Sequence, residues 1–491
     1  MTDITRRTFL KSLGIATTAC VLRNRTVGAV ASKKQPNFLF ILVDDLGWAD
    51  LGCYGSTFYE SPNVDRIAAE GMKFTNGYAA CPVCSPTRAS LMTGKHPARL
   101  NLTNWISGKI KKKLIGAPFI QQLPLEEFTI AEAFKESGYK TFFAGKWHLG
   151  KTEFWPEHQG FDINKGGCHK GGPYSGGKYF TPYDNPRLED GPRGEHLPDR
   201  LATETAKFIE QNKDKPFFAY LSFYSVHEPI MTRDDLLEKY TKKAESFPET
   251  LLEQEGDKKN RLTQNHPVYA GMIEAMDEAI GKVFKKLEAL RLYDDTIVCF
   301  LSDNGGLSTH NNRPTSNVPL RAGKGYTYEG GIRVPFIVKW PGVTKPGAVC
   351  DEPVVSTDFY PTLLEMAGMK PRPDRHRDGL SLGPLLKGAD SLDRRALYWH
   401  YPHYAPQGGR PSSAVRAGDY KLIEFYEDGR IELFNVAEDI SEKRNLSKSM
   451  PEKAKELHEM LMAWRVKVDA KMPSPNPEYR EEKTPAEGSA R

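Results

Sequence analysis

The segment 37-NFLFILVDDLG-47 decides the fold, because it is a continuous apolar run that ends in two carboxylates and a glycine. A run that is apolar at every position, instead of every second one, predicts a strand buried on both faces, as in a parallel sheet. In open α/β sheets, ligands bind at the carboxyl ends of the strands. We therefore expect Asp44 and Asp45 to lie at the functional edge of a sheet.

Further buried strands are predicted along the chain, with helices between them. The strand segments are 140–146, 215–227, 294–306 and 334–342. Periodicity and capping residues predict helices at 61–71, with Ser61 as cap and Gly71 as stop, at 129–138, with Thr129 as cap, and at 266–292. Strands that alternate with helices in this way predict an α/β sheet sandwiched by helices.

The pattern changes after the last predicted strand of this sheet. We expect a catalytic domain at 36–386 and a smaller C-terminal α+β domain, an antiparallel sheet plus a helix, at 387–471. Glycine and proline are frequent at 166–198, which predicts a long insertion loop that could shape a substrate cleft. The Pro, Glu and Ser content of 472–491 predicts a disordered tail.

The first 31 residues have the pattern of an export signal. Arg6 and Arg7 precede a short apolar stretch rich in small residues, and Ala29 to Ala31 form a plausible signal-peptidase site. The apolar stretch is too short to span a bilayer. We expect a twin-arginine signal peptide, the twin-arginine export machinery as partner, a periplasmic or secreted protein, and no stable membrane insertion. Lipidation at Cys20 stays open.

Composition bounds the class of protein. A chain of 491 residues favours one large domain with a smaller one. The formal net charge of +5 arises from 68 basic and 63 acidic residues, a small excess that gives no case for nucleic acid as a partner.

The segment 81-CPVCSPTRASLMTG-94 has two cysteines three apart, and three chemistries compete for it: a redox dithiol, half of a zinc site, or a cysteine that reacts alone. A zinc site needs a second pair of Cys or His ligands at comparable spacing, and the sequence has none. A thioredoxin-like motif opens a helix in a small βαβ unit, whereas Pro86 and Arg88 follow here in a much larger protein. The sequence therefore gives little support to a zinc site or to a redox dithiol.

Polar groups at the strand ends suggest a metal and an anionic substrate. Asp44 and Asp45, with Asp303 and Asn304, are hard oxygen donors that favour calcium or magnesium over zinc. Cationic or titratable side chains occur in other blocks of the sequence, namely Arg88, Lys146, His148, His227 and Lys324. Positive charge beside a metal suits a tetrahedral oxyanion ester, whose transition state carries charge on its oxygens.

These blocks resemble the formylglycine-dependent sulfatases of arylsulfatase type in the alkaline phosphatase superfamily. The matching blocks occur in the family's order, as 44-DDLGWADLGCYG-55, 84-CSPTRASLMTG-94, 145-GKWHLG-150, 225-SVHEP-229, 301-LSDNGG-306 and Lys324. The resemblance covers about 36–446. It implies an alkaline-phosphatase-like α/β fold with a central mixed sheet, a bound calcium ion, and oxidation of Cys84 to formylglycine by a maturation enzyme.

The resemblance also implies roles for individual residues. Calcium would be held by Asp44, Asp45, Asp303, Asn304 and residue 84. Arg88 would steady the hydrated aldehyde, His148 would handle its proton, and Lys146 and Lys324 would bind sulfate oxygens. His227 would protonate the leaving oxygen, although the choice between His227 and Lys324 as general acid stays open. In this mechanism sulfate is transferred to residue 84 and then released.

The expected reaction is hydrolysis of a sulfate ester on a sulfated glycan, by exo action on a sugar sulfate. His169, Lys170, His400 and His403 could contact the sugar near the sulfate, or could make only hydrogen bonds within loops. A phosphonate monoester or phosphodiester hydrolase with the same formylglycine is the nearest rival enzyme. A two-zinc phosphatase is disfavoured by the missing histidine ligands. A catalytically dead protein that binds sulfated glycans is the rival of another class.

Overall fold

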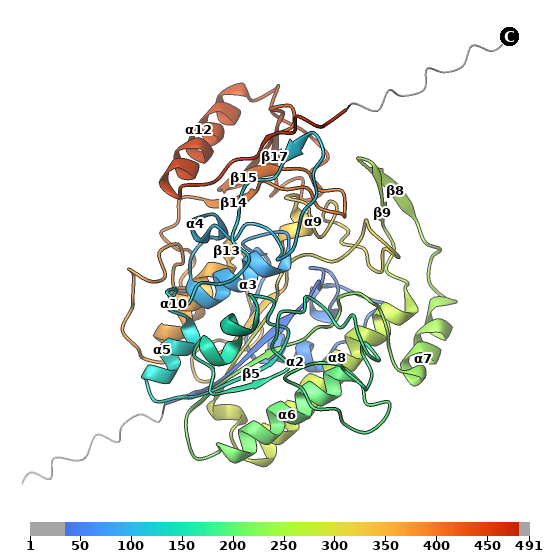
Figure 1. Cartoon of the computed structure of the whole chain (residues 1–491), viewed down its shortest axis with the longest axis vertical. Helices are drawn as coiled ribbons and strands as arrows, with labels where there is room; N and C mark the ends of the chain where they lie inside the picture. Colours follow the sequence, from blue (N-terminus) through green and yellow to red (C-terminus); the bar gives the residue numbers. More distant parts are fainter. Residues whose placement is uncertain (1–34, 481–491) are drawn as a thin grey trace, which may run out of the picture. The chain divides into compact units, whose positions relative to one another are not determined.

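A sheet of eight strands forms the centre of the computed structural model, which describes residues 35–480 (Figure 1). From one edge to the other its strands are β12 (Ala348–Cys350), β2 (Met72–Phe74), β11 (Phe336–Lys339), β10 (Thr296–Ser302), β1 (Asn37–Val43), β7 (Phe217–Ser222), β5 (Lys140–Gly145) and β6 (Ile163–Lys165). Strand β11 is antiparallel to both of its neighbours, and the other pairings are parallel. The sheet is therefore mixed, which confirms the predicted fold class.

The register of the central strands brings their carboxyl ends together. Val43 of β1 pairs with Ser302 of β10, and Leu42 of β1 pairs with Ser222 of β7. Ser222 in turn pairs with Gly145 of β5. Because these strands are parallel and end at the same level, the residues that follow them meet at one edge of the sheet.

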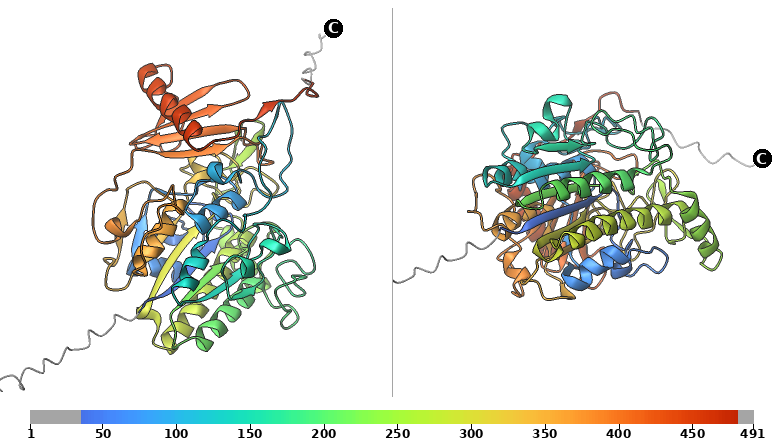
Figure 2. Two further views of the ribbon diagram at one scale, coloured as in Figure 1. Left: turned by 60° about the vertical axis from the view of Figure 1, so that its left-hand side comes forward. Right: turned by 90° about the horizontal axis from the view of Figure 1, so that it is seen from below.

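Helices cover both faces of this sheet (Figure 2). Alternate side chains of β1 enter two separate hydrophobic clusters, because successive side chains of a strand point to opposite faces. One cluster contains residues of α2 (Pro62–Glu70), α6 (Leu197–Gln211) and α8 (Pro267–Ala289). The other contains residues of α3 (Cys84–Thr93), α5 (Ile130–Glu136) and α10 (Phe359–Met366).

The remaining elements of this part of the chain are shorter. They are α4 (Pro97–Leu100), α7 (Asp234–Ala244), α9 (Glu329–Ile332), α11 (Gly383–Leu386), the hairpin β8 (Leu252–Glu255) and β9 (Lys258–Arg261), and the pair β3 (Gly77–Tyr78) and β13 (Val354–Val355). Single 3₁₀ turns lie at 52–54, 152–154, 156–158, 293–295 and 356–358. The predicted insertion at 166–198 is irregular up to the start of α6.

The ends of two helices show where the predicted caps hold. Thr129 caps α5 in a capping box with Glu132, as expected. Ser61 makes no side-chain hydrogen bond to the backbone of α2, and its Oγ donates to Asp65 instead. The carboxylate of Asp277, on α8, accepts from the backbone N–H groups of Asn63 at 3.1 Å and Val64 at 2.8 Å. Ser61 therefore occupies the N-cap position as predicted, but its side chain does not cap the helix, because a carboxylate from a distant helix bonds the backbone there.

The C-terminal part is an antiparallel sheet covered by one helix. Its strands are β14 (Leu397–Tyr401), β15 (Ser412–Ala417), β16 (Tyr420–Phe425) and β17 (Ile431–Asn435), and its helix is α12 (Pro451–Lys467). A buried Lys421 on β16 joins this sheet to the rest of the fold, since its Nζ lies 2.9 Å from carboxylates of both Glu329 and Glu442. This arrangement confirms the predicted α+β architecture.

The segment after α12 differs from the expected disordered tail as far as the structure describes it. Strand β18 (Ser474–Pro475) pairs with β4 (Leu114–Ile115), and the backbone N–H of Asn476 donates to the carbonyl of Lys113. Residues 474–476 are thus ordered by hydrogen bonds to β4, which is far away along the chain. The rest of the expected tail, 481–491, and the expected signal peptide lie outside the described residues. Between residues 35 and 480, no helix is long and apolar enough to cross a membrane.

Candidate active site

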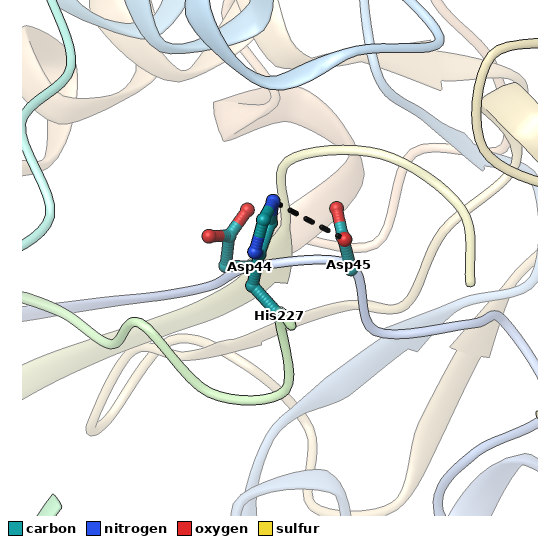
Figure 3. A group of neighbouring side chains, drawn as sticks. All are labelled: Asp44, Asp45 and His227. Atoms are coloured by element: carbon teal, nitrogen blue, oxygen red, sulfur yellow. Dashed lines mark ion pairs between the residues drawn. The ribbon is translucent and has the colours of Figure 1, made fainter. Parts of the chain in front are cut away.

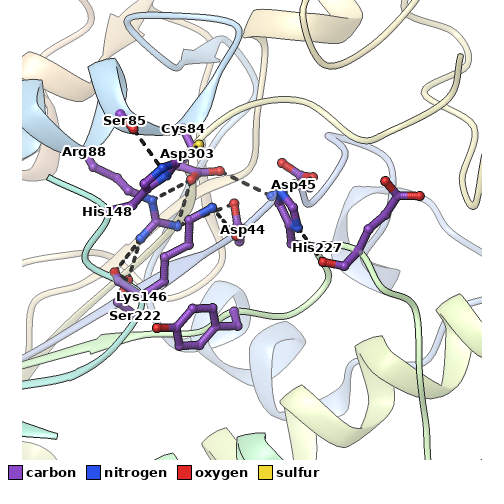
Figure 4. Close-up of polar contacts among 12 residues, drawn as sticks. Asp44, Asp45, Cys84, Ser85, Arg88, Lys146, His148, Ser222, His227 and Asp303 are labelled. Atoms are coloured by element: carbon purple, nitrogen blue, oxygen red, sulfur yellow. Dashed lines mark hydrogen bonds and ion pairs between the residues drawn. The ribbon is translucent and has the colours of Figure 1, made fainter. Parts of the chain in front are cut away.

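Polar side chains gather at the edge of the sheet where the central strands end. Asp44 and Asp45 follow β1, Asp303 and Asn304 follow β10, Lys146 follows β5, and His227 lies in the loop after β7. Figure 4 shows most of them side by side with Cys84, Arg88 and His148. The structure thus brings together the residues that the sequence predicted from separate blocks.

The acidic residues form a buried cluster with oxygens that lack hydrogen-bond partners. Ligand atoms of Asp44, Asp45 and His227 lie within 4.8 Å of one another (Figure 3). The Oδ1 atoms of Asp44 and Asn304 are buried and accept no hydrogen bond in the described part of the chain. Burying carboxylates costs free energy unless a cation or donors compensate. The residues present therefore fit a hard metal ion.

Two lysines border the acidic cluster. The Nζ of Lys146 lies 2.6 Å from Asp44 Oδ2, and the Nζ of Lys324 lies 2.6 Å from Asp45 Oδ2. Burial raises the pKa of Asp44, and the charge of Lys146 opposes this shift only in part. For Asp45, burial also acts to raise the pKa, but the charge of Lys324 and its other cationic neighbours hold it well below its usual value.

Arg88 connects the acidic cluster to the strand ends. Its Nε donates to Asp303 Oδ2 at 2.8 Å, and its Nη2 lies 2.7 Å from the same oxygen. Its Nη1 donates to the carbonyl of Lys146 at 2.7 Å and to the hydroxyl of Ser222 at 2.8 Å. A planar guanidinium held at this many points is fixed in orientation. Sequence analysis missed Ser222, the last residue of β7.

Cys84 is the first residue of α3 and is 3% exposed. Its Sγ lies 3.4 Å from His148 Nδ1, and the Ser85 hydroxyl lies 3.2 Å from the same nitrogen. Burial raises the pKa of the Cys84 thiol, so the unmodified side chain is a neutral thiol near pH 7. Burial, with the charge of Lys146, lowers the pKa of His148, so its ring is neutral and able to accept a proton.

A cavity of about 200 Å³, open to solvent on one side, lies over these groups. Residues already predicted from the sequence line its floor, namely Cys84, His148, His227 and Lys324. Side chains that sequence analysis missed line its walls, namely Trp105, Tyr174, Glu228, His310, Asn311 and Gln407.

A glycine makes room for the histidine in the floor. A Cβ on Gly171 would lie 2.7 Å from Cε1 of the His148 ring, which is closer than carbon atoms approach in proteins. The insertion loop therefore packs directly on His148 only because residue 171 has no side chain. Gly171 and Tyr174 of this loop line the cavity, as expected for a loop that shapes a cleft.

The two histidines expected to bind sugar from the C-terminal part do not line the cavity. His400 is buried on β14, where its ring bonds the Ser413 hydroxyl and the carbonyl of Lys471. His403 is 4% exposed, and its Nε2 lies 2.8 Å from the Thr103 hydroxyl. These contacts correct the expectation, because both rings are buried away from the cavity, with both nitrogens of His400 and Nε2 of His403 hydrogen-bonded inside the protein.

The two candidates in the insertion loop also lie away from the cavity lining. The ring of His169 stacks on Trp155 with 6.2 Å between ring centroids. The Nζ of Lys170 donates to the Ser175 hydroxyl at 2.7 Å and pairs with Asp184. Loop hydrogen bonding, the alternative reading of this segment, describes Lys170 better than contact with a sugar in this cavity.

The fold and this floor define a hydrolase of tetrahedral oxyanion esters, with cations and buried carboxylates around one cysteine. The sulfatase family profile matches residues 36–369, and the profile of the N-sulphoglucosamine sulphohydrolase C-terminal region matches residues 322–467. The chain belongs to the sulfatase family, which confirms the resemblance, and it is a sulfuric ester hydrolase.

Individual relatives cover most of the chain. A sulfatase of Formosa agariphila is 34% identical over 89% of this chain and 90% of its own length. The N-acetylgalactosamine-6-sulfatase of Canis lupus familiaris is 33% identical over 82% of this chain and 74% of its own length. The crystal structure of Ps i-CgsB in complex with k-i-k-neocarrahexaose aligns with a TM-score of 0.74 and 28% identity, covering 92% of this chain and 96% of that chain.

Proposed function

We propose that this sulfatase removes sulfate from sulfated glycans by exo action on a sugar sulfate, using a formylglycine made from Cys84 and a calcium ion. The observation that carries the proposal is the convergence of Cys84, His148 and the buried acidic cluster under one cavity. The glycan substrate is supported by the names of two similar proteins, an N-acetylgalactosamine-6-sulfatase and a protein crystallised with a neocarrahexaose.

Calcium suits the donor set because the ligands are oxygens of carboxylates and an amide. Asp44, Asp45, Asp303 and Asn304 would hold the ion together with residue 84. When present, the hydrated formylglycine supplies a hydroxyl nucleophile and calcium stabilises its negative charge and that of the sulfate.

The remaining residues of the floor have roles that follow from their positions. Arg88 fixes Asp303 through two contacts and keeps this carboxylate facing the metal site. Lys146 and Lys324 each use one N–H for an aspartate, which leaves two donors for sulfate oxygens. His148, neutral and 3.4 Å from residue 84, accepts the proton whose loss expels sulfate.

In this proposal the proton for the leaving oxygen comes from His227 or Lys324, and two observations bear on the choice between them. Nδ1 of His227 lies 2.7 Å from the carbonyl oxygen of Glu228, which can only accept, so Nδ1 carries the proton of the neutral ring. Burial lowers the pKa of both groups, but for Lys324 the acidic groups of Asp45, Cys84 and Asp44 together outweigh burial and raise its pKa. Near neutral pH Lys324 is therefore protonated, whereas the one proton of the neutral His227 ring is bonded to the Glu228 carbonyl, and on this ground we propose Lys324 as the proton donor.

Free sulfate released by the matured protein from sulfated galactan, fucan and glycosaminoglycan oligosaccharides tests the substrate class. A phenylphosphonate monoester and a phosphodiester in the same assay test the rival activity. Sulfate release from at least one oligosaccharide, well above turnover of the phosphorus esters, is the expected result. Mass spectrometry of the peptide that contains residue 84 should show an aldehyde, and an unmodified thiol in fully active protein would contradict the proposed nucleophile.

Asp303→Ala tests the metal site with a readout besides activity. We expect the variant to lose its bound calcium, measured by elemental mass spectrometry, and to lose turnover while keeping the fold by circular dichroism. Asp214→Ala, at an exposed carboxylate before β7, is the matched control and should keep both metal and activity. Full activity of Asp303→Ala without bound metal would refute the assignment.

We also propose export of the protein to the periplasm or the medium through the twin-arginine machinery, after its maturation enzyme has acted. Replacing Arg6 and Arg7 by lysine should retain the protein in the cytoplasm. Cell fractionation with an activity assay measures this, and unchanged export of the double variant would contradict the signal assignment.

A further inference from the structure

Glu228 places a carboxylate in the wall of the cavity, directly after His227 of the floor. Its Oε2 accepts a hydrogen bond from Asn311 Nδ2 at 2.5 Å, and Asn311 lines the same cavity. Among residues 35–480, Asn311 is the one side chain that hydrogen-bonds this carboxylate, which leaves acceptor sites on both oxygens for a ligand.

The charge of Glu228 is not neutralised by the protein. No Lys, Arg or His of the described chain lies within ion-pair distance of its carboxylate. The two charged groups that act on it most are Asp45, which raises its pKa, and Lys324, which lowers it. Lys324 is already paired with Asp45 at 2.6 Å. Burial is the largest influence and also raises the pKa of Glu228, as expected for a partly buried acid without a counter-ion.

The other walls suit an uncharged ring. Trp105 and Tyr174 contribute aromatic side chains, and Gln407 an amide. Aromatic faces pack against the C–H face of a sugar, while carboxylates and amides bind its hydroxyls. The cavity therefore combines a cationic floor for one sulfate with a wall that carries a negative charge.

We propose that Glu228 is a specificity-determining residue: it accepts hydrogen bonds from hydroxyl groups of the sulfated sugar and excludes sugars with a second sulfate or a carboxylate beside the scissile sulfate. The inference rests on the proposed glycan function and adds the substrate class, a monosulfated sugar that is otherwise uncharged. A second anion next to Glu228 would be repelled at short range, since both would be negative and Glu228 has no counter-ion.

The test uses matured full-length protein and two pairs of probes: galactose and N-acetylgalactosamine with one sulfate, and each with a second sulfate on the adjacent carbon. We expect the wild type to prefer the monosulfated member of a pair by at least roughly tenfold in kcat/KM. Glu228→Gln keeps the shape of the side chain and removes the charge. The ratio of kcat/KM between the monosulfated and disulfated sugar should therefore fall most of the way to one. Glu238→Gln, an exposed glutamate on α7, removes the same charge elsewhere and should keep the wild-type ratio.

The outcomes separate this inference from the function on which it rests. If the wild type hydrolyses a sugar sulfate and Glu228→Gln has the same ratio as the wild type, the role of Glu228 is refuted and the glycan function stands. A wild type that prefers the disulfated sugars refutes it as well. If the wild type releases sulfate from 4-nitrocatechol sulfate but from none of the sugars, the glycan function fails and the inference fails with it. Melting temperatures of both variants establish that the comparison is made on folded protein.

Discussion

The buried His403 should make the protein less stable in mild acid, independently of its active site. Burial lowers the pKa of His403 to about 3, and its Nε2 bonds the Thr103 hydroxyl. An unfolded histidine has a pKa of roughly 6.5. Below that value the unfolded chain binds a proton that the folded protein excludes. The free energy of unfolding therefore rises with pH between the two pKa values. The contribution of His403 is fully present above the pKa of the unfolded state and is lost as the pH falls below it.

The expected size of this effect follows from the two pKa values. At pH 5 the unfolded side chain is almost fully protonated and the folded one is neutral, which lowers the free energy of unfolding by about 2 kcal/mol relative to pH 7. For a chain of this length, that loss corresponds to a decrease in melting temperature of roughly 2 °C.

His403→Gln isolates this contribution. Glutamine places a polar atom near the position of Nε2, so it can keep the Thr103 hydrogen bond without titrating. We expect the variant to lose less melting temperature than the wild type between pH 7 and pH 5, by roughly 2 °C in scanning calorimetry. The change in melting temperature between pH 7 and pH 5 is compared, so a difference in stability between the two proteins at pH 7 does not affect the result.

Two results would refute this reasoning. An equal decrease in melting temperature for the wild type and His403→Gln would mean that the side chain is not buried neutral. A large increase in KM for a sugar sulfate, with unchanged stability, would return His403 to the sugar-binding role expected from the sequence. The structure predicts an unchanged KM, since His403 does not line the cavity.

Two further substitutions test contacts that hold the fold together. Asp277→Ala removes the carboxylate at the N-terminus of α2 and should cost about 1–3 kcal/mol in free energy of unfolding, seen as a lower melting temperature that the exposed-site control Lys285→Ala does not show. Lys421→Met leaves the buried Glu442 carboxylate without its cation, while Glu329 keeps Arg333 at 3.4 Å, and should cost about 3–5 kcal/mol. Stability should be partly recovered as the pH is lowered, because burial raises the pKa of Glu442 and the variant lacks the lysine that opposes this shift. Lys443→Met is the exposed control, and an equal melting temperature for Lys421→Met and this control would contradict the assigned role.

The sequence predicted the fold where the signal is local. The apolar runs of β1, β7 and β10 are buried on both sides, so each appears as a continuous hydrophobic segment in the sequence. The sequence did not predict hairpin β8–β9, because its strands are mostly polar and lack a continuous hydrophobic segment. Ser61 was correctly placed at the N-cap position of α2, but the sequence could not show that Asp277 bonds the backbone there, because Asp277 is far away along the chain.

Pairing between strands explains the correction for His400. His400 was predicted to bind sugar because it is a histidine in an aromatic segment. Neither property indicates to which side of the strand its side chain points. The register of β14 on β15 sets His400 opposite Ser413, and the Ser413 hydroxyl then bonds the ring. Register depends on pairing with a second strand and on the turns, so the direction of a single side chain cannot be derived from its own strand alone.

The candidate site divides in the same way into a floor that the sequence reveals and walls that it does not. Buried residues beneath this floor, such as Asp44 and Asp303, follow buried strands that end at one level, so sequence position alone brings them together. Wall residues such as Trp105, Glu228 and Asn311 come from separate loops, and no spacing relates them. On the proposed function, the reacting and metal-binding groups lie in and beneath the floor, and the groups that would select among sugars lie in the walls. A change in the floor should abolish metal binding and turnover, whereas a change at Glu228 should alter which sugar is hydrolysed.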